Sequence, residues 1–362
     1  MVNAESAPVR VLEVDASATE ANSDGHPTVA GRVLDDTERR CEVSSQPAVH
    51  GKPSAGVESA VPSQGQLWGI VLAGGEGVRL RALVRRVCAD DRPKQYVPLF
   101  GDRTLLQQTL DRVALGIPPN RTAVVTLRSH AACFAEQAGC SRSPHVLVQP
   151  ADRGTAVGVL FPAHWVSWQD PDATVAVFPS DHFVLGEARF MAHIVETAAW
   201  VDQHPDRLVL LGAQATHAEV EYGWIELGRP LSLASDPRIW EVRRFWEKPS
   251  GETARICLEA GCLWNTSVLV GKAGTFLRAG HDALPEVHDR LARLQPFLGT
   301  EEETWALQQA YALIPKADFS HSVLEPCPSF LAVSELPRVT WSDLSSPRQV
   351  IDILRRVASM PS

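Results

Sequence analysis

The chain lacks the features of a membrane-spanning, secreted or nucleic-acid-binding protein. None of its 362 residues lies in an apolar run that approaches the ~20 residues of a membrane-spanning helix. Its N-terminus has no basic region followed by an apolar stretch, so it does not match a secretory signal. The formal net charge of -9 argues against a general nucleic-acid binder. We therefore expect neither a membrane nor a nucleic acid as a partner.

The cysteines give no sign of a disulfide framework or a structural zinc site. There are seven of them, an odd number, and none are spaced as C-x-x-C. This pattern is typical of reduced thiols. Together with the missing secretory signal, it predicts a cytoplasmic location.

Aromatic residues are absent from residues 1–65, which carry ten acidic and five basic residues. Such a segment can bury too little apolar surface to offset the entropy lost on ordering. We expect a mostly disordered acidic extension, with a regulatory tail as the alternative. Residues 66–362 are expected to form one domain.

Apolar runs typical of strands alternate with helical patterns from residue 66 onward. The predicted strands are residues 68–73, 121–127, 145–150, 174–180 and 207–213, and the predicted helices are residues 105–114, 130–139, 156–168 and 188–203. This alternation predicts an α/β fold, a mostly parallel sheet with helices on both faces. The second half is less regular: we expect antiparallel strands at 222–227 and 240–249 and helices at 250–261, 281–297 and 301–313.

A glycine-rich turn follows the first predicted strand. In AGGEGVRL (73–80), Gly74, Gly75 and Gly77 remove side chains where a polyphosphate would lie against backbone N–H groups. The turn is not a dinucleotide fingerprint, because the position of the third glycine is Leu80, and it is not a P-loop, because no lysine follows Gly77. Arg79 adds a cation suited to phosphate.

Two further motifs follow predicted strands, QPADRGTA (149–156) and PSDH (179–182). Ligands of such sheets bind beyond the carboxyl ends of the strands, so we expect both motifs and the glycine turn to meet at one edge.

The glycine turn, RPKQ (92–95) and five further segments resemble the motifs of sugar-1-phosphate nucleotidyltransferases, most closely mannose-1-phosphate guanylyltransferases. The other segments, in order, are QPADRGTA, PSDH, YGWIEL (222–227), FWEKPS (245–250) with LWNTSVLV (263–270), and TWSDLSS (340–346). The resemblance spans about residues 66 to 350. It implies a Rossmann-like fold of the nucleotide-diphospho-sugar transferase type, with a small antiparallel sugar-binding insertion.

The resemblance also implies a role for each matching residue. Nucleotide binding falls to Ala73, Gly74, Gly75, Gly77, Gln149, Gly154 and Thr155. Sugar binding falls to Gly223, Glu247 and Asn265, and Mg²⁺ binding to Asp181 and Asp343. The catalytic cations are Arg79 on the leaving pyrophosphate, Lys94 near the α-phosphate and Lys248 on the sugar phosphate.

The implied reaction needs no general base. A sugar 1-phosphate oxygen attacks the α-phosphorus of a nucleoside triphosphate in line, and pyrophosphate leaves. The attacking phosphate has a second pKa near ~6 and is largely dianionic at neutral pH. Catalysis is therefore positioning and electrostatic stabilisation.

Each assignment has a structural alternative. Asp181 could cap a turn, Asp343 could be the N-cap of the last helix, and Lys94 and Lys248 could be solvated loop charges. We interpret His182 as structural rather than as a metal ligand. The tryptophans of the motifs are expected to form pocket walls and core: Trp224, Trp246 and Trp264.

The chain also departs from the family pattern. Val78 replaces a threonine, and Ser345 replaces a glycine, where a side chain could shift Asp343. The stretch before RPKQ is longer than usual, and its arginines could hold the triphosphate or line a loop: Arg85, Arg86 and Arg92.

Three functional hypotheses follow. The leading one is a Mg²⁺-dependent enzyme that makes GDP-mannose from GTP and mannose 1-phosphate. The second is the same reaction with another base or hexose 1-phosphate. The third is a non-catalytic paralogue that binds a nucleotide sugar and regulates a partner through the acidic extension. The sequence contains no signal for the oligomeric state.

Overall fold

The structure, a computed structural model, describes residues 67–137, 145–232 and 238–358. The predicted extension over residues 1–65 lies outside these ranges, so the expectation of disorder stays a prediction. The strands are β1 (Leu67–Leu72), β2 (Thr122–Leu127), β3 (His145–Gln149), β4 (Thr174–Pro179), β5 (Phe183–Leu185), β6 (Leu208–Gln214), β7 (Trp224–Ser232), β8 (Ile239–Trp246), β9 (Leu263–Lys272), β10 (Leu331–Glu335) and β11 (Thr340–Ser342).

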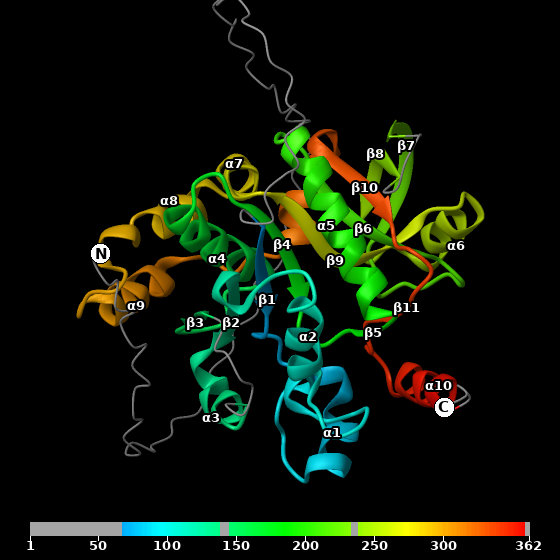
Figure 1. Ribbon diagram of the computed structural model, residues 1–362, viewed down its shortest axis with the longest axis horizontal. Coiled ribbons are helices and arrows are strands. Elements are labelled where there is room, and N and C mark those ends of the chain that lie inside the picture. Colours follow the sequence, from blue (N-terminus) through cyan, green and yellow to red (C-terminus); the bar gives the residue numbers. More distant parts are fainter. Residues whose placement is uncertain (1–66, 138–144, 233–237, 359–362) are drawn as a thin grey trace, which may run out of the picture. The chain divides into compact units, whose positions relative to one another are not determined.

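The helices surround these strands (Figure 1). They are α1 (Arg81–Cys88), α2 (Leu105–Val113), α3 (Ala131–Ala135), α4 (Thr155–Gln169), α5 (Glu187–Gln203), α6 (Gly251–Glu259), α7 (Ala273–Ala283), α8 (Pro285–Ala292), α9 (Glu303–Leu313) and α10 (Pro347–Ala358). A π-helical turn, Ser320–Leu324, precedes β10.

Nine of the described strands form one sheet in the order β3-β2-β1-β4-β9-β6-β10-β8-β7. Neighbours are parallel from β3 to β4 and between β6 and β10. Only β9 and β8 run against the others in this sheet, so seven of the nine strands share one direction. The predicted α/β fold with a mostly parallel sheet is confirmed, and the predicted antiparallel strands β7 and β8 continue that sheet beyond β10.

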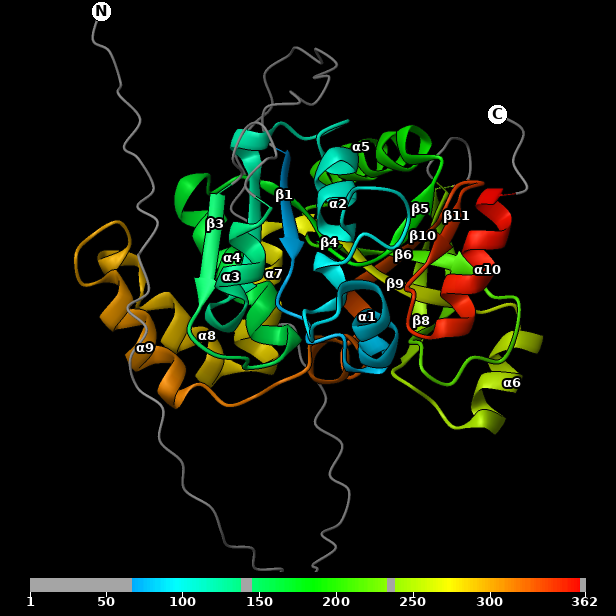
Figure 2. The same cartoon turned by 90° about the horizontal axis from the view of Figure 1, so that it is seen from below.

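Both faces of the sheet are buried over β1, β2, β4 and β6, which explains why these strands read as nearly continuous apolar runs. Ile70 packs into one apolar cluster with residues of α4 and α7, whereas its neighbour Val71 packs into another with residues of α2 and α5. Val125 and Val124 of β2 divide between the same two clusters. The sheet is therefore the middle layer of three, with a helical layer on each face (Figures 1 and 2).

A separate two-stranded ribbon brings two distant parts of the chain together. β5 and β11 pair antiparallel, with Ser342 opposite Phe183. Asp181 and His182 immediately precede β5, and Asp343 immediately follows β11. The register thus places two of the predicted site residues at the same end of the ribbon, although 162 positions separate them in the sequence.

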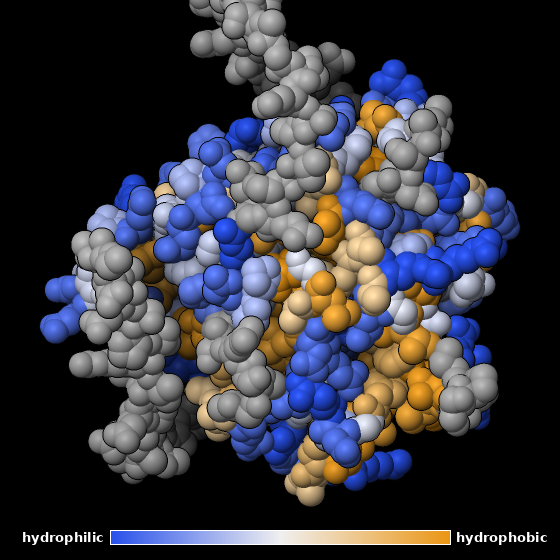
Figure 3. Space-filling view, in the orientation of Figure 1, coloured by the Kyte–Doolittle hydropathy of each residue, from blue (hydrophilic) through white to orange (hydrophobic). Residues whose placement is uncertain are grey.

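The final helix α10 closes this end of the domain. Its Val350 and Ile353 belong to a third apolar cluster. In this cluster they pack with Leu80, which precedes α1, and with Val84, which lies within α1. The side chains on its outer face remain exposed and contribute to the apolar surface over α10 in Figure 3: Ile351, Leu354 and Val357.

The helix predicted over residues 281–297 is wrong as a single element. α7 ends at Ala283, and α8 begins at Pro285 after Leu284 adopts a non-helical conformation. Proline has no N–H to continue the first helix but fits the first position of the next one. The predicted helix over 130–139 is shorter in the structure, as α3 (Ala131–Ala135).

We expect Leu210→Ala to lower the free energy of unfolding by about 2–5 kcal/mol, because Leu210 is fully buried in β6, between β9 and β10. The matched control is Leu313→Ala, since that side chain on α9 is 61% exposed and its loss should change stability by less than about 0.5 kcal/mol. Urea unfolding followed by tryptophan fluorescence measures both. Equal losses would contradict the central position of β6.

Candidate active site

The glycine turn after β1 is held by buried side chains that bond its carbonyl groups. Gln95 Nε2 donates to the carbonyl oxygens of Ala73 and Gly75, at 2.9 Å each, and Tyr96 Oη donates to Ala73 at 3.3 Å. No acceptor within the described residues pairs with the backbone N–H groups of residues 74–77. The turn therefore presents free donors, which is the arrangement that binds anions.

Gly77 has to be glycine for two reasons. Its φ is +59°, in the left-handed region. A Cβ there would also lie 2.9 Å from Cβ of Lys94. The turn and Lys94 are thus packed directly against each other.

Arg79 lies just beyond the turn, on a short 3-10 segment (Val78–Leu80). Its side chain is 50% exposed, and Nη1 donates to Glu221 Oε2 at 3.2 Å. Val78, where the family pattern has threonine, is exposed beside it. Arg79 is an accessible cation next to free N–H donors, in the position expected for a phosphate contact.

Lys94 joins the two predicted metal-binding segments. Its side chain is only 6% exposed, and Nζ lies 3.0 Å from Asp181 Oδ2. The same ammonium donates to the carbonyl oxygens of Asp343 at 2.6 Å and Leu344 at 3.2 Å. All three ammonium hydrogens are engaged. Lys94 is therefore no solvated loop charge; it organises the acidic pair, and it reaches a phosphate only as a nearby charge.

Charge and burial have opposite effects on Asp181 and His182. Burial alone would raise the pKa of Asp181, but attraction to Lys94 and a hydrogen bond from it hold that pKa below its usual value. Burial lowers the pKa of His182, against the attraction of Asp181 and Asp343. His182 packs edge-on against Trp341 at 5.5 Å. Its Nδ1 is buried without a hydrogen-bond partner in the described part of the chain, and the structural role stays a prediction.

The acidic pair fits a divalent cation that also binds substrate oxygens. Asp343 Oδ1 accepts hydrogen bonds from Tyr222 Oη and Ser345 N–H, while nothing in the described ranges donates to its Oδ2. Within the described ranges, the ionisable partner of Asp181 Oδ1 is His182, with Nε2 at 3.9 Å. No group of three or more His, Cys, Asp or Glu in the described part of the chain is arranged to hold a metal alone. Mg²⁺ suits such a site because it takes one or two carboxylates together with phosphates.

The second predicted nucleotide segment follows β3. Gln149 is buried, its Oε1 accepts from Tyr311 Oη at 3.1 Å, and its Nε2 would lie 3.5 Å from a Cβ on Gly74. The two nucleotide segments are therefore in contact, as predicted. No hydrogen bond joins this Nε2 to an acceptor in the described part of the chain.

Gly154 and Thr155 instead attach this segment to the chain before β10. Gly154 has a φ of +84°, and a Cβ there would overlap the carbonyl oxygen of Ala317. The hydroxyl of Thr155 donates to Asp318 Oδ2 at 2.9 Å and accepts from Phe319 N–H at 2.8 Å. Both residues shape the loop, and the Thr155 hydroxyl is already used.

The three predicted sugar-binding residues lie together. A Cβ on Gly223 would lie 3.0 Å from Glu247 Oε2 and 3.1 Å from Asn265 Cβ. Asn265 N–H donates to the Gly223 carbonyl at 2.8 Å. Burial, with repulsion from Asp318 and Glu325, raises the pKa of Glu247 to about 7, although Lys248 opposes the shift.

Lys248 is the accessible cation of this subsite, with a side chain 54% exposed and Nζ 3.9 Å from Glu247 Oε1. Its φ of +46° is strained for a residue with a side chain. Ser267 and Leu344 share this strain, and each adjoins or lies close to a predicted site residue. Such strain concentrates at functional sites because the surrounding structure has to maintain it.

The tryptophans match the predicted walls and core. Trp224 is fully buried, and Trp264 packs edge-on against it at 6.0 Å. Trp246 is half-buried, with the Arg244 guanidinium 4.9 Å from its ring centroid.

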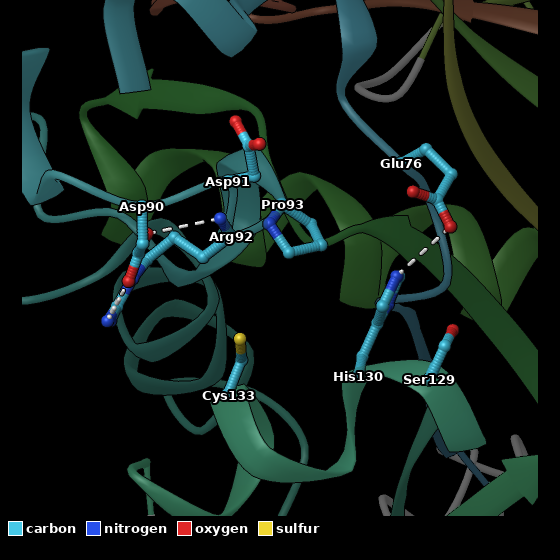
Figure 4. A pocket seen from close by; sticks show the side chains of 8 residues that line it. All are labelled: Glu76, Asp90, Asp91, Arg92, Pro93, Ser129, His130 and Cys133. Atoms are coloured by element: carbon cyan, nitrogen blue, oxygen red, sulfur yellow. Dashed lines mark hydrogen bonds and ion pairs between the residues drawn. The ribbon is translucent and has the colours of Figure 1, made fainter. Parts of the chain in front are cut away.

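A shallow pocket lies between the glycine turn and residues 90–93, which belong to the longer connection that leads to Lys94 (Figure 4). Glu76 and His130 face each other there, with Oε1 and Nε2 3.3 Å apart. Arg92 pairs with Asp90 and Glu136, and Arg85, which does not line the pocket, pairs with Asp91, which does. Acidic neighbours thus neutralise two of the three added arginines, which favours the loop-lining alternative. We place the active site at the Asp181–Asp343 pair instead.

Several residues of the site were absent from the sequence predictions. Tyr222 contacts Asp343, Tyr311 contacts Gln149, and Glu325 Oε1 lies 3.4 Å from Glu247 N. Tyr222 adjoins the predicted Gly223, which was the one available signal. Tyr311 and Glu325 lie outside every motif, so only the fold brings them in.

None of the helices in the described part of the chain has the length and apolar character needed to cross a bilayer.

Comparison with known proteins connects this geometry to a family. The family model for nucleotidyl transferases matches residues 68–359. The xanthan biosynthesis protein XanB of Xanthomonas campestris pv. campestris is 29% identical over 289 residues, covering 78% of this chain and 58% of that protein. Mannose-1-phosphate guanylyltransferase 2 of Escherichia coli O157:H7 is 30% identical over 228 residues, covering 61% and 46%.

The chain thus spans about half the length of the curated relatives it matches. A crystal structure described as mannose-1-phosphate geranyltransferase from Thermus thermophilus superimposes with a TM-score of 0.68 at 29% identity, covering 82% of this chain and 80% of that one. Since the family model covers most of the chain and the fold agrees, the chain belongs to the nucleotidyl transferase family.

Proposed function

We propose that the chain transfers a nucleotidyl group from GTP to mannose 1-phosphate, which releases pyrophosphate and forms GDP-mannose. The observation that carries this proposal is the convergence of Asp181, Asp343 and Lys94 beside a turn with free N–H donors. The choice of GTP and mannose rests on the relatives described as mannose-1-phosphate guanylyltransferases.

The triphosphate lies on the glycine turn in this proposal. The N–H groups of residues 74–77 donate to phosphate oxygens, and Arg79 binds the departing pyrophosphate through its planar fork. The Nε2 group of Gln149 donates to the base. Lys94 acts through its charge, since its hydrogens hold Asp181 and the 343–344 backbone.

Asp181 and Asp343 are the residues that would hold Mg²⁺. Bound there, the ion would neutralise negative charge on the α-phosphate oxygens. The protein's own contribution is to keep the two carboxylates fixed at the end of the β5–β11 ribbon.

The sugar phosphate occupies the side formed by Gly223, Glu247 and Asn265. Gly223 lets the sugar ring approach the backbone, and the two polar side chains bind its hydroxyls. Lys248 binds the attacking phosphate, which is already ionised at neutral pH with its second pKa near ~6. The enzyme therefore orients two anions and has no need to remove a proton.

We also propose that the protein acts in the cytoplasm. Four cysteines in the described part of the chain are free thiols: Cys88, Cys133, Cys257 and Cys262. This agrees with a reducing compartment.

The first test is pyrophosphate release from a panel of nucleoside triphosphates and hexose 1-phosphates with Mg²⁺. We expect the highest kcat/KM for GTP with mannose 1-phosphate. Preference for UTP or dTTP would replace the guanylyl assignment, and the absence of turnover with every pair would favour a non-catalytic nucleotide-sugar-binding protein.

We expect Asp181→Asn and Asp343→Asn each to lower kcat by at least ~100-fold, because each removes a charge that would hold the cation. Asp206→Asn is the matched control, since that side chain is 73% exposed and lies outside the site. Circular dichroism checks that each variant is folded. Wild-type rates in both site variants would remove the metal assignment.

Glu247 is expected to make stability fall as the pH rises from about 4.5 to about 7. Its pKa is raised from 4.5 to about 7, so in this window the folded state binds more protons than the unfolded state. Glu247→Gln should therefore gain stability relative to the wild type between pH 4.5 and pH 8, on the order of 2 kcal/mol.

Urea unfolding at several pH values measures this difference. Glu252→Gln is the control, because Glu252 is exposed on α6. If the free energy of unfolding varied with pH in parallel for the wild type and Glu247→Gln, the pKa of Glu247 would not be raised in the folded protein.

A further inference from the structure

A chain of hydrogen bonds runs from α10 to the carboxylate of Asp343. It begins at Gln349, in the first turn of the helix. Gln349 Oε1 accepts from Ser345 N–H at 2.7 Å, from the Ser345 hydroxyl at 2.9 Å and from Ser346 N–H at 3.0 Å. Ser345 is the position where the family pattern has glycine.

These donors fix the orientation of the Gln349 amide. An oxygen has to face three converging donors, so Nε2 has to face the other way, where Tyr222 Oη lies at 2.6 Å. Because Nε2 can only donate, the hydroxyl of Tyr222 accepts from it. The single hydrogen of that hydroxyl is then directed to Asp343 Oδ1.

The phenol ring cannot easily leave this position. Tyr222 is 6% exposed, and its ring packs edge-on against Trp264 at 5.2 Å and Trp341 at 5.7 Å. A hydrogen bond to a carboxylate is shorter and stronger than one between neutral groups. The rigid ring therefore holds Asp343 in one side-chain orientation.

The backbone of Ser345 also binds the carboxylate of Asp343. Its N–H is shared between Gln349 Oε1, at 2.7 Å, and Asp343 Oδ1, at 3.0 Å, so Oδ1 has a second donor besides the Tyr222 hydroxyl. The backbone is fixed as well, because Lys94 Nζ binds the Asp343 carbonyl and Leu344 adopts a φ of +52°. One oxygen of Asp343 is thus held by the protein, and Oδ2 remains for a cation.

We propose that Tyr222 and Gln349, locked by the Ser345 hydroxyl, are positioning residues that hold Asp343 for a divalent cation. The proposal rests on the proposed function, in which Asp343 is a metal ligand. It also reverses the expectation for Ser345: its side chain does not disturb the site but anchors the amide that orients Tyr222. Outer partners of a metal ligand typically change metal affinity by 10–100-fold.

The test is Mn²⁺ binding to the full chain in the presence of GDP-mannose, followed by electron paramagnetic resonance. We expect Tyr222→Phe, which keeps the ring but loses the hydroxyl, to raise the Mn²⁺ Kd by about 10-fold or more. The Mg²⁺ concentration for half-maximal rate should shift by a similar factor, whereas the KM for the hexose 1-phosphate should stay within about twofold because no sugar contact is lost.

A second variant leaves Asp343 and Tyr222 unchanged. In Gln349→Glu the new carboxylate cannot donate to Tyr222, so the hydroxyl turns its hydrogen toward residue 349 and away from Asp343. We expect a similar loss of Mn²⁺ affinity. Ser345→Gly should lower Mn²⁺ affinity less. It removes the hydroxyl bond to Gln349 Oε1 but keeps the bonds from the backbone N–H groups of residues 345 and 346.

The matched control is Thr197→Val, which also deletes a buried hydroxyl, here one that donates to the His193 carbonyl within α5 and lies outside the site. It should leave Mn²⁺ affinity unchanged. Wild-type Mn²⁺ affinity in folded Tyr222→Phe or Gln349→Glu would overturn the proposal, as would a wild type that binds no Mn²⁺. Failure of the proposed function is separate: it is the absence of turnover by the wild type, whatever the Mn²⁺ data show.

Discussion

The ion pair between Lys94 and Asp181 is the interaction on which the site depends. A buried ammonium is costly unless carboxylate and carbonyl oxygens surround it, and here these come from two segments that are far apart in the sequence. The same lysine packs beneath Gly77, so the anion-binding turn also rests on it. One buried charge therefore contacts the turn, Asp181 and the backbone of Asp343, and it holds these three loops against one another.

The segment before β10 connects the nucleotide side of the site to the sugar side. Lys316 pairs with Asp152, Ala317 packs on Gly154, and Asp318 accepts from Thr155. A few residues later Glu325 lies beside Glu247. One short stretch of backbone therefore contacts both subsites.

Sequence reasoning succeeded where chemistry is local. The glycine turn and the strand ends follow from motif and periodicity, whereas the grouping of Gly223, Glu247 and Asn265 was implied by the resemblance to a known family. It failed where the decisive contact is long-range: Tyr222 and Asp343 are 121 positions apart, and no pattern in either segment indicates their bond. The prediction of a single helix over residues 281–297 was wrong because the apolar pattern continues through Pro285, whereas a helical backbone cannot continue through a proline without losing a hydrogen bond.

The β5–β11 ribbon has three residues in each strand and lies outside the nine-stranded sheet. Side chains alternate between the two faces of a ribbon, so a shift of one residue would turn Asp343 away from Asp181. Only the native register of β5 and β11 therefore brings the carboxylates of Asp181 and Asp343 together. Short peripheral pairings open at a lower free energy than a central sheet. We therefore expect this ribbon to open before the nine-stranded sheet does, and its opening would separate Asp181 from Asp343 while the sheet stays folded.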